Sequence, residues 1–127
     1  MKTAFVTGGS RGIGSAIALA LGKTFHVIVG FANSEDKAND VVKEIVASGG
    51  SASAVQIDIS DAESVDNAFT TIEKEYNSVD VLINNAGVTK DNILPRMKED
   101  EWLEVIQTNL TGSFYTSQRA IKLMMKN

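Results

Sequence analysis

A glycine-rich turn, Thr7-Gly8-Gly9-Ser10-Arg11-Gly12-Ile13-Gly14, has the clearest chemical potential in this chain. The apolar residues 4–6 precede it and the amphipathic residues 15–21 follow it, which predicts a strand, a turn and a helix. A helix N-terminus presents free backbone N–H groups and a partial positive charge, so it can hold a phosphate. Glycines let the backbone turn sharply and approach a ligand closely. The context therefore favours a dinucleotide as the ligand.

The glycine spacing has two other interpretations. It is T-G-x-x-x-G-x-G and not G-x-G-x-x-G, and glycines at such a place can simply form the turn. A P-loop for nucleoside triphosphates is the second alternative, because Gly9 and Gly14 have the P-loop spacing. Ser15, however, stands where that loop needs a lysine to reach the phosphates. Triphosphate hydrolysis is therefore disfavoured.

The residues after the second apolar run bear on which dinucleotide would fit. An NAD site usually has an acidic residue here, which accepts a hydrogen bond from the ribose 2′-hydroxyl. Residues 30–33 contain no acid, and Glu35 is the first one after them. Arg11 in the glycine turn could meet a 2′-phosphate through a charge-assisted contact, which favours NADP. The alternative is that Arg11 is a solvated surface arginine.

Polar residues at three further positions are candidates for contact with a ligand. Asp58 follows the third apolar run, Asn84-Asn85-Ala86-Gly87 follows the fourth, and Asn109 lies within an apolar helical segment. Each position has a structural alternative. Asp58 can begin the turn into Ser60, the segment 84–87 can be an ordinary turn, and Asn109 can bond to its own backbone. Their occurrence in one chain favours a shared functional site.

Four short apolar runs predict the strands that would position these residues: 3–7, 26–29, 54–57 and 79–83. They do not alternate strictly, as is typical of strands buried on both faces of a parallel sheet. Amphipathic segments with i, i+3, i+4 spacing separate them. The order βαβαβαβα predicts an α/β fold with a parallel sheet and right-handed crossovers. Gly22 and Gly49-Gly50 are expected to end helices, and residues 60–63 to form a capping box.

Residues 99–127 predict a helix that is apolar on more than one face. Trp102, Ile106, Leu110 and Phe114 form one stripe at i, i+4 spacing, and further apolar residues lie on other faces. Such a helix needs cover on more than its sheet side. The fourth strand is also expected to leave an unpaired edge. Both features predict a homo-oligomer that forms through the fourth helix and the fourth strand.

Composition excludes several classes of function. The 127 residues fit one domain, and the hydrophobic content of 43% is enough for a sizeable core. There is no cysteine and one histidine, His26, so neither a disulfide framework nor a metal site is expected. A net charge of −4 argues against nucleic acid as a partner. Because neither a signal peptide nor a membrane span is evident, we expect a cytoplasmic protein.

Together these motifs resemble the short-chain dehydrogenase/reductase family. The resemblance rests on residues 7–14, Asp58, residues 84–87 and Asn109, in that order and at natural spacing over the whole chain. A narrower resemblance, to bacterial 3-oxoacyl-[acyl-carrier-protein] reductases of fatty-acid synthesis, rests on the residues between the fourth strand and the last helix. These are Val88-Thr89-Lys90-Asp91-Asn92, Arg96-Met97-Lys98 and Trp102.

The resemblance implies a role for each matching residue. The pyrophosphate and the adenosine ribose of NADP would be lined by Gly8, Ser10, Arg11, Gly12, Ile13 and Gly14. Asn33 would lie near the 2′-phosphate, while Asp58 and Ile59 would contact the adenine. Asn85, Ala86 and Gly87 would border the cofactor at the end of the fourth strand. Asn109 would be the helix asparagine that helps hold a water molecule in the proton relay.

The family's catalytic serine and Tyr-x-x-x-Lys pair have no counterpart in these 127 residues. Tyr76 is followed four places on by Asp80, and Tyr115 by Arg119, which is too basic to act as the lysine does. Tyr115 is interpreted as a packing residue. The resemblance therefore implies that residues 1–127 form the N-terminal half of one NAD(P)-binding Rossmann domain, truncated after the fourth helix. Its α/β, Rossmann-type three-layer fold would have a parallel sheet of order 3-2-1-4.

The resemblance implies that the full-length family reduces 3-oxoacyl thioesters on acyl carrier protein with NADPH. This half is expected to bind NADP without turning it over. One alternative is a self-associating structural half-domain without appreciable cofactor binding. Another, weaker one is a natural module that senses NADPH.

Overall fold

Four parallel strands form one sheet in the order β3-β2-β1-β4, as the sequence predicts. The computed structural model describes residues 1–87 and 94–126. The strands are β1 (Thr3–Val6), β2 (His26–Phe31), β3 (Ser51–Gln56) and β4 (Val81–Ile83). β2 extends two residues beyond its predicted end, and β3 begins three residues before its predicted start, because their ladder runs from His26–Ser51 to Phe31–Gln56.

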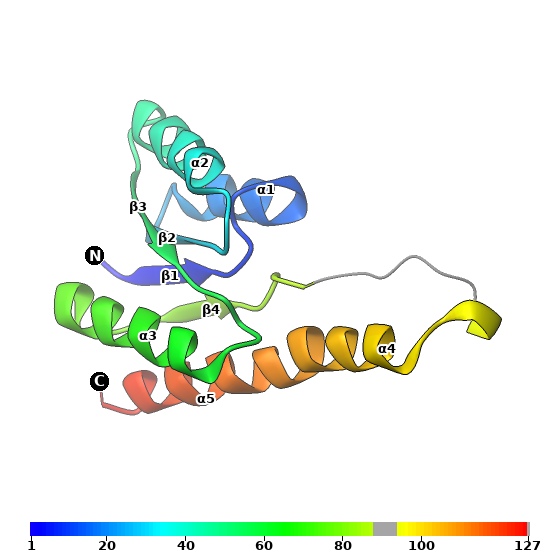
Figure 1. Cartoon of the computed structure of the whole chain (residues 1–127). Helices are drawn as coiled ribbons and strands as arrows, with labels where there is room; N and C mark the ends of the chain where they lie inside the picture. Colours follow the sequence, from blue (N-terminus) through cyan, green and yellow to red (C-terminus); the bar gives the residue numbers. More distant parts are fainter. Residues whose placement is uncertain (88–93, 127) are drawn as a thin grey trace.

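Helices cover both faces of the sheet, which gives the three layers of the predicted fold (Figure 1). On one face lie α1 (Gly12–Leu21) and α2 (Glu35–Ala47); on the other lie α3 (Ala62–Tyr76) and α5 (Gly112–Met124). The single helix predicted over residues 99–127 is divided into α4 (Glu99–Val105), a π-helical segment η2 (Ile106–Thr111) and α5. A short 3-10 turn, η1 (Leu94–Arg96), precedes α4.

Side chains on both faces of β1 and β2 are buried, which explains the unbroken apolar runs of these two strands in the sequence. Phe5 and Ile28 pack toward α3 and α5, whereas Val6 and Val29 on the same strands pack toward α1 and α2. Phe5 meets Phe69 edge to face, with ring centroids 5.5 Å apart. This alternation is the period-two geometry of a strand between two layers.

The helix ends confirm the predicted glycine stops and correct one predicted cap. Gly22 caps α1, and Gly49, at φ +89, follows α2 with N–H groups of Gly49 and Gly50 returning to Val46 and Ile45. At the start of α3 the predicted capping box over residues 60–63 is wrong. Asp61 is the cap and accepts from the Glu63 N–H at 3.0 Å, whereas the Ser60 hydroxyl donates to Asp58.

His26 lies in a small polar cluster at the amino ends of β2 and β3. Its Nδ1 is hydrogen-bonded to Ser51 Oγ at 2.5 Å, and its Nε2 to Ser53 Oγ at 3.1 Å. Tyr76 donates its hydroxyl proton to the same Ser53 Oγ at 2.8 Å and stacks on the imidazole with centroids 4.7 Å apart. Burial lowers the pKa of His26 below its ordinary value of 6.5. The folded chain therefore favours the neutral imidazole.

This histidine makes the free energy of unfolding depend on pH. Just below pH 6.5 the unfolded chain takes up a proton that the folded chain refuses, so stability falls as the pH falls until the folded imidazole also titrates. We expect a slope of less than about 1.4 kcal/mol per pH unit, since the ring is partly solvated. Urea unfolding at pH 7.5 and 5.5 would measure it. His26→Gln should flatten the slope, and equal slopes in both proteins would contradict the assignment.

Within the described residues, no helix has the length and apolar character needed to cross a membrane.

Candidate functional site

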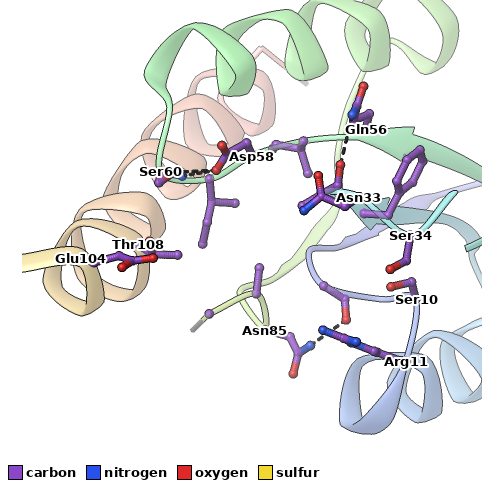
Figure 2. A pocket seen from close by; sticks show the side chains of 17 residues that line it. Ser10, Arg11, Asn33, Ser34, Gln56, Asp58, Ser60, Asn85, Glu104 and Thr108 are labelled. Atoms are coloured by element: carbon purple, nitrogen blue, oxygen red, sulfur yellow. Dashed lines mark hydrogen bonds between the residues drawn. The ribbon is translucent and has the colours of Figure 1, made fainter. Parts of the chain in front are cut away.

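The carboxyl ends of the strands meet at one edge of the sheet, where the chain forms a cleft of about 630 Å³ (Figure 2). Ligands of open α/β sheets bind at this edge, where strand order reverses. Here that point lies between β1 and β4, since β2 continues the sheet on the other side of β1. The structure brings the following predicted site residues together around the cleft: Gly8, Ser10, Arg11, Asn33, Asp58, Ile59, Asn85, Ala86 and Gly87.

The glycine turn forms one wall of this cleft and leads into the first turn of α1. Gly8 and Gly12 have φ values of +62 and +58, in the left-handed region that favours glycine. A side chain on Gly14 would overlap the carbonyl oxygen of Gly8 and the side-chain amide nitrogen, Nδ2, of Asn85. Gly14 therefore allows the helix N-terminus to pack directly on the turn. This N-terminus is the element that could hold a phosphate.

Four predicted site residues do not line the cleft itself: Gly12, Ile13, Gly14 and Asn109. A side chain on Gly12 would meet no neighbour, and the side chain of Ile13 is 76% exposed. Gly14 acts through packing, as described above. Asn109 on η2 lies beside the cleft, because its Oδ1 is 2.8 Å from the place that a side chain on Gly87 would take. Their roles toward a cofactor stay predictions.

Partly buried hydrogen bonds fix the segment after β4 to the glycine turn. Thr7 Oγ1 accepts from the N–H groups of Asn85 and Ala86, each at 3.1 Å. Asn85 Nδ2 in turn donates to the carbonyl of Gly8 at 2.9 Å. These bonds join the ends of β1 and β4 at the point where strand order reverses. The rim of the cleft is thus preorganised by the fold, which would reduce the entropy lost on binding.

Asp58 both shapes the turn after β3 and lines the cleft. Its Oδ1 accepts from the backbone N–H of Ser60 at 3.0 Å and from the Ser60 hydroxyl at 2.6 Å. Its own N–H donates to Ser64 Oγ at 2.9 Å. Asp58 therefore has the structural role that the sequence also allowed, which is to begin the turn into Ser60. This role coexists with a place on the cleft wall, where a carboxylate can accept from a bound donor.

Arg11 and Asn33 reach the cleft from two different loops (Figure 2). Arg11 precedes α1 and its side chain is exposed, while Asn33 follows β2. The loop after β2 thus brings an amide and no acid to the wall. This chemistry is compatible with a phosphate on the ribose and offers no carboxylate for a free 2′-hydroxyl.

Several residues of the cleft were not among the predicted site residues: Phe31, Ala32, Ser34, Gln56, Ile57, Ser60, Glu104 and Thr108. All but the last two end or follow β2 or β3, so the strand-end rule could have identified them. Glu104 and Thr108 come from α4 and η2 (Figure 2), which fold back across the end of β3. Gln107 helps hold them there by donating to the Ser60 carbonyl at 3.1 Å.

Tyr115 lies away from the cleft, as its interpretation as a packing residue requires. It packs against the core under α3, and the Arg119 guanidinium lies 5.5 Å from its ring centroid. Arg119 also donates to Asp66 of α3 at 2.6 Å, and this contact lowers the pKa of the Asp66 carboxyl. The segment Val88-Thr89-Lys90-Asp91-Asn92, which the narrower resemblance uses, lies outside the described residues.

The glycine turn lies at a helix N-terminus and is hydrogen-bonded to the Asn-Asn-Ala-Gly segment after the neighbouring strand. This arrangement, on a parallel sheet of order 3-2-1-4, is typical of Rossmann-type folds. The sequence profile of the family described as short chain dehydrogenase matches residues 2–127. The chain belongs to this family.

Particular relatives refine this placement. The chain is 48% identical over 126 residues to 3-oxoacyl-[acyl-carrier-protein] reductase of Synechocystis sp., covering 98% of this chain and 51% of that protein. It is 47% identical to 3-oxoacyl-[acyl-carrier-protein] reductase FabG of Staphylococcus aureus, with the same coverage. A crystal structure of a metagenomic short-chain oxidoreductase in complex with NADP superposes with a TM-score of 0.91 at 35% identity, over 98% of this chain and 57% of that one. The chain spans about half the length of the curated relatives that it matches.

Proposed function

We propose that these 127 residues form the NADP-binding half of one short-chain dehydrogenase/reductase domain. The observation that carries the proposal is the cleft itself, in which the glycine turn, Asp58 and residues 85–87 meet at the point of strand reversal. The metagenomic relative that shares this fold is in complex with NADP. The fit is supported by the close packing at Gly14, which leaves the α1 N-terminus accessible to a phosphate.

Different residues of the cleft would contact different parts of the cofactor. Backbone N–H groups of the turn and of α1 would hold the pyrophosphate. Arg11 and Asn33 would read the 2′-phosphate, and Asp58 would accept from the adenine amine. Residues 85–87 would border the nicotinamide ribose, with Asn109 behind them. When bound, NADPH would supply a hydride to a carbonyl carbon.

In the complete protein we infer reduction of 3-oxoacyl thioesters carried by acyl carrier protein, in the cytoplasm. The support is the identity of 47–48% to reductases named for that reaction. The 127 residues contain no Tyr-x-x-x-Lys. We therefore expect this chain to bind NADP but not to consume NADPH when a 3-oxoacyl thioester is added.

Thermal unfolding combined with a turnover assay tests this proposal. A ligand that binds only the folded chain raises the midpoint of unfolding in proportion to RT ln(1 + [L]/Kd). NADP should raise the midpoint, and absorbance at 340 nm should stay constant with NADPH and thioester. Steady NADPH oxidation by the purified chain would contradict the proposal that these residues bind the cofactor without turning it over. An unmoved midpoint would instead favour a structural half-domain.

The structural alternative has its own support in an exposed apolar face on the final helical segment. Trp102, Leu103, Leu110, Phe114 and Ile121 are each more than half exposed. Among the described residues, β4 pairs with β1 alone in the sheet. We propose that two copies of the chain associate through this face and this edge, as apolar cover and strand pairing would both favour.

Substitution on this face should change the oligomeric state. Phe114→Glu places a charge at its centre and is expected to shift sedimentation velocity profiles from dimer toward monomer. Val46→Glu is the matched control, because Val46 is equally exposed but lies on α2. A parent chain that sediments only as monomer would refute the proposal.

A further inference from the structure

A polar bracket, formed by Asn84, Thr116 and Ser117, joins α5 to the end of β4. Thr116 is fully buried, and its hydroxyl donates to Asn84 Oδ1 at 2.5 Å. The carbonyls of Gly112 and Ser113 lie farther from this hydroxyl, at 3.3 and 3.1 Å. Asn84 Nδ2 donates to Ser117 Oγ at 3.0 Å. Both ends of one amide are thus bound by consecutive residues of the helix.

The bracket lies directly beside the cofactor cleft. Asn84 immediately precedes Asn85, Ala86 and Gly87, which form the β4 side of the cleft. Thr116 lies on the helical path that carries Thr108 and Glu104, which form another part of the wall (Figure 1). The bracket therefore connects two walls of the cleft through one pair of side chains.

The helix keeps one face toward the sheet over an unusual distance. Glu104, Thr108, Gly112 and Thr116 are spaced four apart, and each contacts the cleft or the sheet side. In an uninterrupted α-helix each step of four residues rotates by about 40° beyond a full turn. The π-helical η2 lies within this stretch, and its wider i→i+5 turns reduce that rotation. The cleft wall and the bracket can therefore share one face.

Contacts at three places keep the helix in this register. Gln107 binds the Ser60 carbonyl at the cleft, and a side chain on Gly112 would lie 2.7 Å from the Ile59 carbonyl, which shows how closely the helix approaches there. The apolar contacts of Ala120 and Leu123 hold the far end of α5. Between the cleft end and the far end of this helical stretch, the Thr116 hydroxyl forms its hydrogen bond to Asn84. A directional hydrogen bond specifies register more strictly than apolar packing does.

We propose that Thr116 is a positioning residue for the NADP site, which holds the helical wall of Glu104 and Thr108 in register with residues 85–87. This inference rests on the proposed function. Thr116 itself does not line the cleft, so its effect on binding must pass through Asn84 and the helix.

The experiment compares Thr116→Val, which keeps the side-chain shape, with Thr116→Ser, which keeps the hydroxyl. Affinity for NADP and for adenosine 2′,5′-bisphosphate is measured by calorimetry at low temperature, with urea unfolding of each variant. We expect Thr116→Val to weaken both ligands by about three- to tenfold, the equivalent of one lost hydrogen bond. Thr116→Ser should restore the parent affinities. Thr70→Val is the control, because the hydroxyl of the exposed Thr70 donates to the Asp66 carbonyl of its own helix, α3.

The outcomes separate this inference from the function on which it rests. Thr116→Val with lower stability but parent affinity would overturn the positioning role. A parent chain that binds neither ligand would overturn the proposed function and this inference with it. If Thr116→Val does not fold, Asn84→Ala removes the acceptor of the Thr116 hydroxyl at an exposed position that does not line the cleft. Weaker binding by that variant supports the role, and parent affinity overturns it.

Discussion

Gly14→Ala is expected to remove NADP binding and to destabilise the chain by roughly 3 kcal/mol, the upper range for overpacking. The added methyl group would overlap the Gly8 carbonyl and the Asn85 amide. Neither can move freely, because the Asn85 backbone and side chain are bound to Thr7 and Gly8. The α1 N-terminus would have to withdraw from the turn. Urea unfolding and calorimetric titration measure the two effects.

Gly49→Ala is the matched control for this substitution. Gly49 has φ +89 and open space around it, so a methyl group there meets no neighbour. Its cost of about 1–2 kcal/mol would come from the left-handed backbone alone. Affinity for NADP should not change, since Gly49 lies at the far end of α2. A Gly14→Ala protein as stable as the parent would show that the close approach at Gly14 is not required.

Arg11→Ala is expected to weaken NADP by about 1.5–3 kcal/mol, the range for a hydrogen bond to a charged group. NAD, which has no 2′-phosphate, should be affected little. Arg11 is the cation on the cleft wall, and the loop after β2 presents Asn33 instead of an acid. Paired calorimetric titrations with NADP and NAD would measure the difference.

Lys23→Ala provides the charge control for Arg11, because Lys23 is an exposed cation after α1 and away from the cleft. It should leave the ratio of the two affinities unchanged. An equal loss of NADP and NAD in Arg11→Ala would show that Arg11 does not read the 2′-phosphate. It would then be the solvated surface arginine that the sequence also allowed.

The sheet could be predicted because its strands are short apolar runs separated by strongly periodic helices. Phe5 and Val6, adjacent in β1, are buried on opposite faces, and this is the origin of the unbroken pattern. Most residues of the cleft follow from the same strand assignment, because each motif lies just after a strand. Polar groups at the carboxyl ends of parallel strands meet at one edge.

The remainder depended on contacts between distant segments. Ser60 was expected to cap α3, but its hydroxyl bonds Asp58 and leaves the cap to Asp61. Competing side-chain partners of this kind are not resolved by local sequence. Glu104 and Thr108 line the cleft from the final helical stretch, which contains the π-helical η2, and the residue spacing does not predict a π-helical turn.

Calorimetric titration of the 127-residue chain with NADP tests the central claim most directly. The account predicts a saturable heat with one site per chain, and a weaker response to NAD. Absence of heat at millimolar NADP, from a chain that unfolds cooperatively, would contradict it. The cleft would then be a feature of the fold, and self-association through the final helix would be the better account of this chain.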